Sequence, residues 1–113
     1  MHEVSIVRDI IQNLEEHYKD RFSEISTVKI EAGLLCNVQP ILIQNAFEAL
    51  RIEDPKLDNI DLQVVLLPII AHCKNCDEDF EVKLHKFVCP KCDTPSRDIV
   101  QGEELRISSV AFF

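Results

Sequence analysis

Two closely spaced cysteine pairs, Cys73-Lys-Asn-Cys76 and Cys89-Pro-Lys-Cys92, place the strongest constraint on how this chain can fold. Thiolates two residues apart can turn back onto one tetrahedral ion, and two such pairs complete the closed four-sulfur site typical of structural zinc. The segment 71–98 carries few aliphatic side chains, and so short a segment cannot hold itself folded by burial alone. We therefore predict a zinc-binding subdomain at 71–98. Iron in the same geometry, for electron transfer, is the competing occupant.

A closed four-sulfur site has no open coordination position for water, so it contributes folding energy rather than hydrolysis. We interpret Cys36, which lies far from both pairs, as a small buried apolar residue. His72 and His85 are interpreted as solvent-facing, although either could replace a protonated or oxidised thiolate. Asp77 and Asp93 follow the second cysteine of each pair, where Gly is common because φ is positive, and Asp tolerates that conformation.

The rest of the chain alternates between helical and extended patterns. Apolar residues recur at helical spacing over about residues 5–19, with Ser5 as the expected N-cap and residues 1–3 as a short extended lead. A second helix is predicted at about 40–51, where Pro40 suits the first turn. Alternation of period two predicts strands at 26–33, 60–67 and 105–112, and residues 53–59 are expected to form a connecting loop.

These patterns predict an α+β protein with two domains. Residues 1–70 are expected to form the first domain, and the segment 71–98 forms the zinc-ribbon-like second one. The strand within 99–113 either returns to the first domain, which it then completes, or extends the zinc subdomain.

Charge argues against several classes of partner. The 113 residues carry 12 Lys and Arg against 20 Asp and Glu, a formal charge of −8, which repels phosphate backbones and anionic membranes. A zinc-ribbon module that binds nucleic acid or another protein is the alternative function, but residues 71–113 hold six basic and eight acidic side chains. No apolar run reaches 18 residues and no signal-peptide pattern occurs, so a cytoplasmic protein is expected.

No catalytic pattern occurs in the sequence. Paired carboxylates, a nucleophile triad and a glycine-rich phosphate loop are all missing, so the protein is not expected to be an enzyme.

The N-terminus offers a second candidate metal site, which would be open to a partner rather than closed like the four-sulfur site. The amine of Met1, the amide nitrogen of His2 and the His2 imidazole can close adjacent chelate rings, and such nitrogen ligands suit nickel(II) or copper(II). The amide or carboxylate of Glu3 could supply the fourth ligand, or that position could stay open to a transfer partner.

Several segments together resemble one known family. They are Met1-His-Glu-Val-Ser5, Lys29-Ile-Glu-Ala-Gly33, Asn45-Ala-Phe-Glu-Ala49, the two cysteine pairs and Gly102-Glu-Glu-Leu-Arg-Ile107. In this order they are similar to the HypA/HybF hydrogenase nickel-incorporation family over nearly the whole chain. The resemblance implies a nickel-binding domain with a three-stranded sheet and two helices, joined to a zinc domain.

The resemblance also implies a function. Members of the family are nickel metallochaperones that supply Ni(II) to maturing nickel-iron hydrogenase and, in some bacteria, to urease. Carried over to this chain, His2 is the nickel ligand, Glu3 contributes through its amide or side chain, and Cys73, Cys76, Cys89 and Cys92 bind Zn(II). The expected partners are a nickel-handling GTPase and the hydrogenase large subunit, with neither nucleic acid nor membrane.

Overall fold

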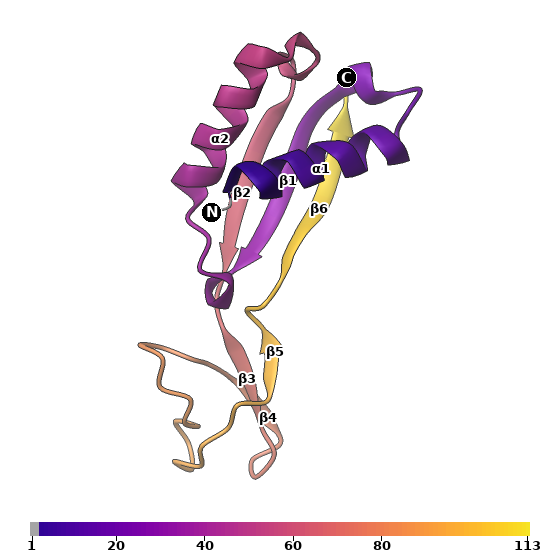
Figure 1. Ribbon diagram of the computed structural model, residues 1–113. Coiled ribbons are helices and arrows are strands. Elements are labelled where there is room, and N and C mark those ends of the chain that lie inside the picture. The colour runs from indigo at the N-terminus through magenta and orange to yellow at the C-terminus, as the bar shows by residue number, and fades with distance from the viewer. Residues whose placement is uncertain (1–2) are drawn as a thin grey trace. The chain divides into compact units, whose positions relative to one another are not determined.

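The computed structural model describes residues 3–113, which fold into two α-helices and two three-stranded sheets (Figure 1). The elements are α1 (Glu3–His17), β1 (Ile25–Gly33), α2 (Pro40–Glu53), β2 (Asp61–Leu67), β3 (Ile70–Cys73), β4 (Glu78–Glu81), β5 (Ile99–Gln101) and β6 (Leu105–Phe112). One sheet has the strand order β2-β1-β6 and the other has the order β4-β3-β5. The predicted α+β class, with two helices and a three-stranded sheet, is confirmed.

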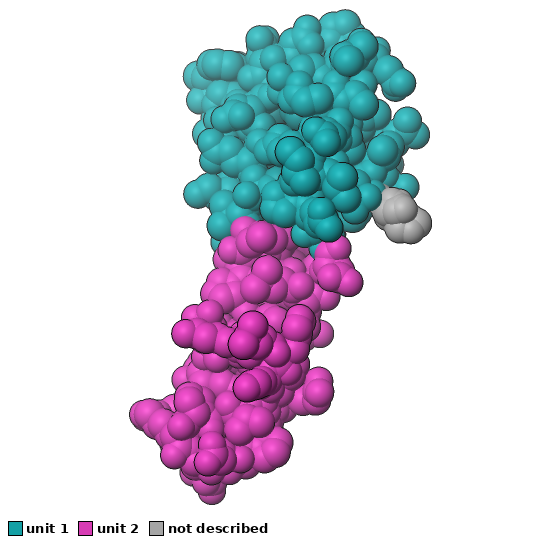
Figure 2. All heavy atoms as spheres, turned by 90° about the vertical axis from the view of Figure 1, so that its left-hand side faces the viewer, with its two compact units in different colours: residues 1–31, 38–65, 106–113 teal, residues 32–37, 66–105 magenta. Residues whose placement is uncertain are grey.

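The chain divides into two compact units (Figure 2). Unit 1 comprises Met1–Glu31, Val38–Val65 and Arg106–Phe113, and unit 2 comprises Ala32–Asn37 and Leu66–Leu105. The final strand, β6, pairs with β1, so it belongs to the sheet that carries the helices. No helix within residues 3–113 is long and apolar enough to cross a membrane.

The core of unit 1 lies between the two helices and the β2-β1-β6 sheet. Val28 and Ile30 of β1 are fully buried, whereas Lys29 between them is exposed, as the alternating pattern predicts. The helices bury the residues that recur at helical spacing, including Leu14 of α1 and Phe47 of α2. Both helices therefore pack their apolar stripes on the same buried cluster.

The start of α1 differs from the prediction. The helix already includes Glu3, so Ser5 lies inside the first turn and is not the N-cap, and Glu3 is not part of an extended lead. A carboxylate in the first turn is favourable because it faces the positive end of the helix dipole. The remainder of the expected lead, Met1 and His2, lies outside the described residues.

The connection from α2 to β2 is also more ordered than predicted. Residues Pro55–Leu57 form a 3-10 helix, in which the Asp54 side chain accepts a hydrogen bond from the Lys56 backbone N–H at 3.0 Å. Leu57 is buried in the core of unit 1. One apolar side chain within a polar loop is too weak a pattern to predict this turn from the sequence.

The only two glycines of the sequence meet in unit 2. A Cβ atom on Gly33 would lie 2.0 Å from the carbonyl oxygen of Gly102. The same carbonyl accepts a hydrogen bond from the Leu35 N–H at 2.9 Å, while the Gly33 N–H donates to the Glu104 carbonyl at 2.7 Å. Gly102 itself has a φ of +129°, which side chains rarely adopt.

Gly33→Ala should therefore destabilise the protein by about 3–5 kcal/mol, because backbone rather than a flexible side chain must move to admit the methyl group. Denaturant unfolding compared with wild type measures this change. Ser109→Ala, at an exposed position of β6, is the control and should change stability by less than about 0.5 kcal/mol. Equal midpoints for wild type and Gly33→Ala would contradict the close approach of the two backbones.

Candidate metal centre

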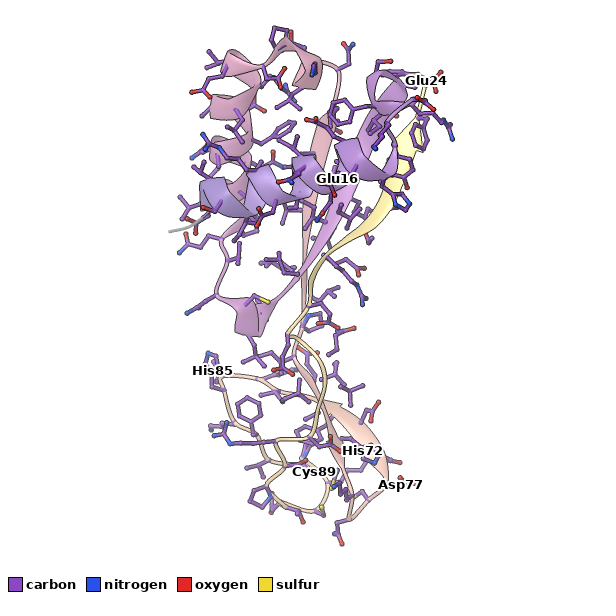
Figure 3. The ribbon with its side chains drawn as sticks, turned by 45° about the vertical axis from the view of Figure 1, so that its right-hand side comes forward. Glu16, Glu24, His72, Asp77, His85 and Cys89 are labelled. Carbon is purple, nitrogen blue, oxygen red and sulfur yellow. The ribbon has the colours of Figure 1, made fainter. Side chains whose placement is uncertain are left out.

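The structure brings together the four predicted cysteine ligands of unit 2, of which Cys89 is labelled in Figure 3. Their sulfur atoms all lie within 4.8 Å of one another. The Cys73–Cys92 sulfur distance is 3.6 Å and the Cys76–Cys89 distance is 3.9 Å. Four sulfurs about 2.3 Å from a tetrahedral zinc ion would lie about 3.8 Å apart, so the donor set and its spacing fit such an ion.

The backbone turns after each cysteine pair explain how the sulfurs come to face one point. Asp77 and Asp93 have φ angles of 56° and 59°, as predicted for the residue after the second cysteine. The Cys76 N–H points at the Cys73 sulfur at 3.5 Å, and the Asp93 N–H donates to the Cys89 carbonyl at 2.9 Å. Each pair is thus folded into a tight turn that directs two sulfurs inward.

Hydrogen bonds shift the pKa values of two of the thiols, Cys92 and Cys76, in opposite directions. Bonds from Asn75 and Thr94 lower the pKa of Cys92 to about 6, and the Thr94 hydroxyl lies 3.2 Å from the Cys92 sulfur. The neighbouring Cys92 sulfur and loss of solvent raise the pKa of Cys76 to about 12. Four thiolates at this spacing need a cation among them to ionise together, which is the electrostatic situation that favours a divalent metal.

Asn75 and Thr94 were not identified from the sequence. A hydroxyl and an amide beside a cysteine pair form no recognisable motif, and their role depends on how the two turns meet. The sequence signal that does exist is proximity, because each residue lies within two positions of a cysteine.

The small core around the sulfurs explains why a metal matters for this unit. Six residues form its buried cluster, namely Ile69, Ala71, Cys73, Phe80, Val82 and Cys89. Two of these six are metal-ligand candidates, so the cysteines are themselves a large part of the apolar interior. In the sheet, β3 pairs with β4 in an antiparallel register that sets Ala71 opposite Phe80.

His72 pairs with two carboxylates and is not part of the sulfur cluster. Its Nδ1 lies 2.8 Å from an Asp79 oxygen, and its Nε2 lies 3.3 Å from an Asp77 oxygen. The hydrogen bond to Asp79 is the main cause that raises the pKa of His72 above its ordinary value. The side chain is half-buried rather than solvent-facing, because both of its nitrogens face these acids.

Cys36 also differs from the interpretation as a buried apolar side chain. It is half-buried, and its thiol lies 3.1 Å from the carbonyl oxygens of both Glu103 and Glu104. The thiol therefore acts as a weak donor to backbone.

The segment Lys83–Lys86, which we call the hairpin tip, reverses the chain after β4. The Lys86 N–H donates to the Lys83 carbonyl at 3.0 Å, and Leu84 and His85 both have positive φ, 54° and 57°. This is the pattern of a type I′ turn, which favours Asn-Gly at its two central positions. An ordinary side chain in the left-handed region costs about 1–2 kcal/mol, so the Leu-His pair is strained. The exposure of His85 agrees with the sequence interpretation.

The predicted nickel ligands are only partly within the described chain. Met1 and His2 lie outside it, and Glu3 is the half-buried first residue of α1. Among residues 3–113, the four cysteines are the one group of His, Cys, Asp and Glu side chains close enough to hold a metal.

The fold and the sulfur cluster define a class of protein, a small α+β protein with a helical unit and a second unit that gathers four cysteines in metal-binding geometry. A family model described as hydrogenase/urease nickel incorporation, metallochaperone, hypA matches residues 1–112. The chain belongs to this HypA family of metallochaperones, which serve hydrogenase maturation and are not enzymes. The resemblance noted in the sequence is thereby confirmed.

Individual relatives agree with the family assignment. The hydrogenase maturation factor HypA of Shewanella sp. (strain MR-7) is 32% identical, covering 93% of this chain and 89% of that protein. The HypA protein of Helicobacter hepaticus is 32% identical, covering 97% and 95% of the two chains. The solution structure of the Ni metallochaperone HypA from Helicobacter pylori matches with a TM-score of 0.66 at 32% identity, covering 99% of this chain and 97% of that one.

Proposed function

We propose that this protein is a nickel metallochaperone that binds Ni(II) at its N-terminus and delivers it during maturation of nickel-iron hydrogenase, and of urease where one is made. The observation that carries the proposal is the family match over residues 1–112, which includes the Met-His-Glu start. A transfer protein needs a site from which a partner can take the ion. A short chelating chain end meets that need better than a closed cage.

The proposed nickel ligands are the Met1 amine, the amide and imidazole nitrogens of His2, and the Glu3 amide or carboxylate. Nitrogen donors in a planar or tetragonal array suit nickel(II). Glu3 opens α1, and the first four N–H groups of a helix have no acceptor within the helix. The Glu3 amide nitrogen could therefore bind a metal without loss of a helical hydrogen bond.

The second metal in the proposal is structural Zn(II), bound by the four clustered cysteines. Support comes from the sulfur distances and from the small core that they complete. In the proposed division of labour, residues 1–70 with the 99–113 strand handle nickel, and residues 71–98 bind zinc. Zinc in a closed four-sulfur site would stabilise unit 2 without taking part in nickel transfer.

The proposed partners are a nickel-handling GTPase and the hydrogenase large subunit, and the proposed location is the cytoplasm. Both follow from the maturation role of the family, because the nickel enzyme must receive its ion before it is complete. The net charge of −8 suits capture of a cation and docking on a complementary protein.

A nickel titration of untagged protein tests the proposal. Wild type should bind about one Ni(II) per chain, and a variant with one residue added before Met1 should lose that binding while its zinc content stays unchanged. The added residue converts the Met1 amine into an amide and so removes one anchor of the chelate. Calorimetry and metal analysis measure the two quantities, and equal nickel affinity in both proteins would reject the amine as a ligand.

A further inference from the structure

The hairpin tip carries unpaired positive charge in an acidic protein. Residues 83–97 contain four Lys or Arg side chains and one Asp, a net charge of +3 within a chain of charge −8. Lys91 is paired with Glu78 across the two cysteine turns. Lys83, Lys86 and Arg97 have no ion-pair partner anywhere in residues 3–113. These three cations are free to interact with a partner.

The three free cations lie on neighbouring segments of unit 2. The Ser96 N–H donates to the Phe87 carbonyl at 2.9 Å, and Val88 pairs with Pro95 in an antiparallel bridge. This pairing places Arg97 alongside the chain that leaves the hairpin tip. The Arg97 guanidinium lies over the Phe87 ring, 4.5 Å from its centroid, which holds its charge in place.

Between Lys83 and Lys86 of the hairpin tip lies an apolar side chain that is almost fully exposed. Leu84 is 87% exposed, more than any other large hydrophobic residue of the described chain. It also occupies the first central position of a turn that Asn would fit without strain. Folding of unit 2 thus gives no reason for leucine at this position, and binding gives one, because a partner pocket would bury it.

We propose that the hairpin tip, with Arg97 beside it, is a docking element that inserts Leu84 into an apolar pocket rimmed by Asp and Glu on a partner protein. Charge complementarity favours a partner protein of this kind, since the free lysines and Arg97 match an acidic rim around its pocket. Nucleic acid and anionic membranes offer a far denser negative charge, but they would also meet the strong net negative charge of the whole chain. The inference rests on the proposed function only in its choice of partners to test.

The test uses the full-length zinc-loaded protein, with the purified maturation GTPase and the purified hydrogenase large subunit of the same organism as probes. The double change Leu84→Asn with His85→Gly removes the apolar anchor but supplies the residues that a type I′ turn prefers, so the hairpin should fold at least as well. Affinity for one of the two probes should fall about tenfold or more, while zinc content and thermal stability are retained. Lys83→Glu with Lys86→Glu should weaken the same complex.

Matched controls separate docking from general effects. Ile52→Ser replaces an exposed apolar residue of α2, 85% exposed, and Lys56→Glu reverses an exposed charge in unit 1. Neither should change the affinity by more than about twofold. Raising the ionic strength from about 0.01 M to about 1 M shortens the Debye length from about 30 Å to about 3 Å and should weaken the wild-type complex more than the lysine-reversal variant.

The outcomes distinguish this inference from the proposed function. If both tip variants bind a probe as tightly as the wild type does, the docking role is overturned and the nickel function is left intact. Absence of wild-type binding to both probes would overturn the docking role together with the partner assignment, whereas the nickel titration decides the metal function independently. Tip-dependent binding to RNA or to phosphatidylserine vesicles would replace the acidic protein by another class of partner and so also overturn the proposal.

Discussion

Replacing Cys89 with alanine should release the bound zinc and unfold unit 2, while unit 1 keeps its helices and its sheet. Cys89 is both a ligand candidate and one of six buried residues in the small core of unit 2. Structural zinc contributes about 10–16 kcal/mol of binding free energy in small zinc domains, and that binding free energy is folding free energy. The Cys89→Ala variant has only three sulfur ligands and a gap in its core, so it cannot recover this folding free energy.

Metal analysis and amide spectra measure this result. Zinc should fall from about one ion per chain towards none, and the amide signals of residues 66–105 should lose their dispersion. Cys36→Ala is the matched control, because this thiol lies outside the sulfur cluster and its hydrogen bonds go to backbone carbonyls. It should retain zinc and lose about 1 kcal/mol of stability. Wild-type protein without zinc, its thiols all open to a thiol reagent in the native state, would contradict the metal assignment.

Replacing His2 with alanine should lower nickel affinity by more than about a hundredfold, because loss of a supporting residue outside the ligands already costs about 10–100-fold in metal sites. Zinc content and fold should stay unchanged. Affinity of the wild type should also fall as the pH drops from about 8 to about 6, since free imidazole and α-amine groups titrate near 6.5 and 7.7–8.0 and protons compete for the same nitrogens.

Two further variants complete the nickel experiment. His17→Ala removes an exposed histidine from the end of α1 and should leave nickel affinity unchanged. Glu3→Gln should have little effect if Glu3 binds through its backbone amide, and a large effect if it binds through its carboxylate. Calorimetry measures the nickel affinity of His2→Ala, His17→Ala and Glu3→Gln. A His2→Ala variant that binds nickel as tightly as the wild type would remove the nickel site from this end of the chain.

The sequence predicts those parts of the fold that repeat a local pattern. β1, α2 and β2 lie within two residues of their predicted bounds, because period-two and helical spacing reflect one buried face. The cysteine cluster was predictable for a similar reason, since the spacing within each pair already determines how two sulfurs can converge. The positive φ of Asp77 and Asp93 follows from the same local geometry.

Features that depend on distant partners were missed. The carboxylates that contact His72 lie in β4 and in the turn between β3 and β4, and the carbonyls that accept from Cys36 come from residues 103–104. Ser5 resembles an N-cap in isolation, but Glu3 continues the helix. For His72 and Cys36, the deciding contact joins residues whose proximity no local pattern encodes.

Because Cys73 and Cys89 belong to the interior of unit 2, the zinc binding proposed above would make the folding equilibrium of this unit follow the concentration of free metal. An ion that binds only the folded state stabilises it in proportion to the logarithm of its free concentration, about 1.4 kcal/mol for each tenfold change above the dissociation constant. The buried cluster of unit 1 contains no cysteine. The buffered zinc level of the cell would then determine how much of the protein presents a folded hairpin tip at any moment.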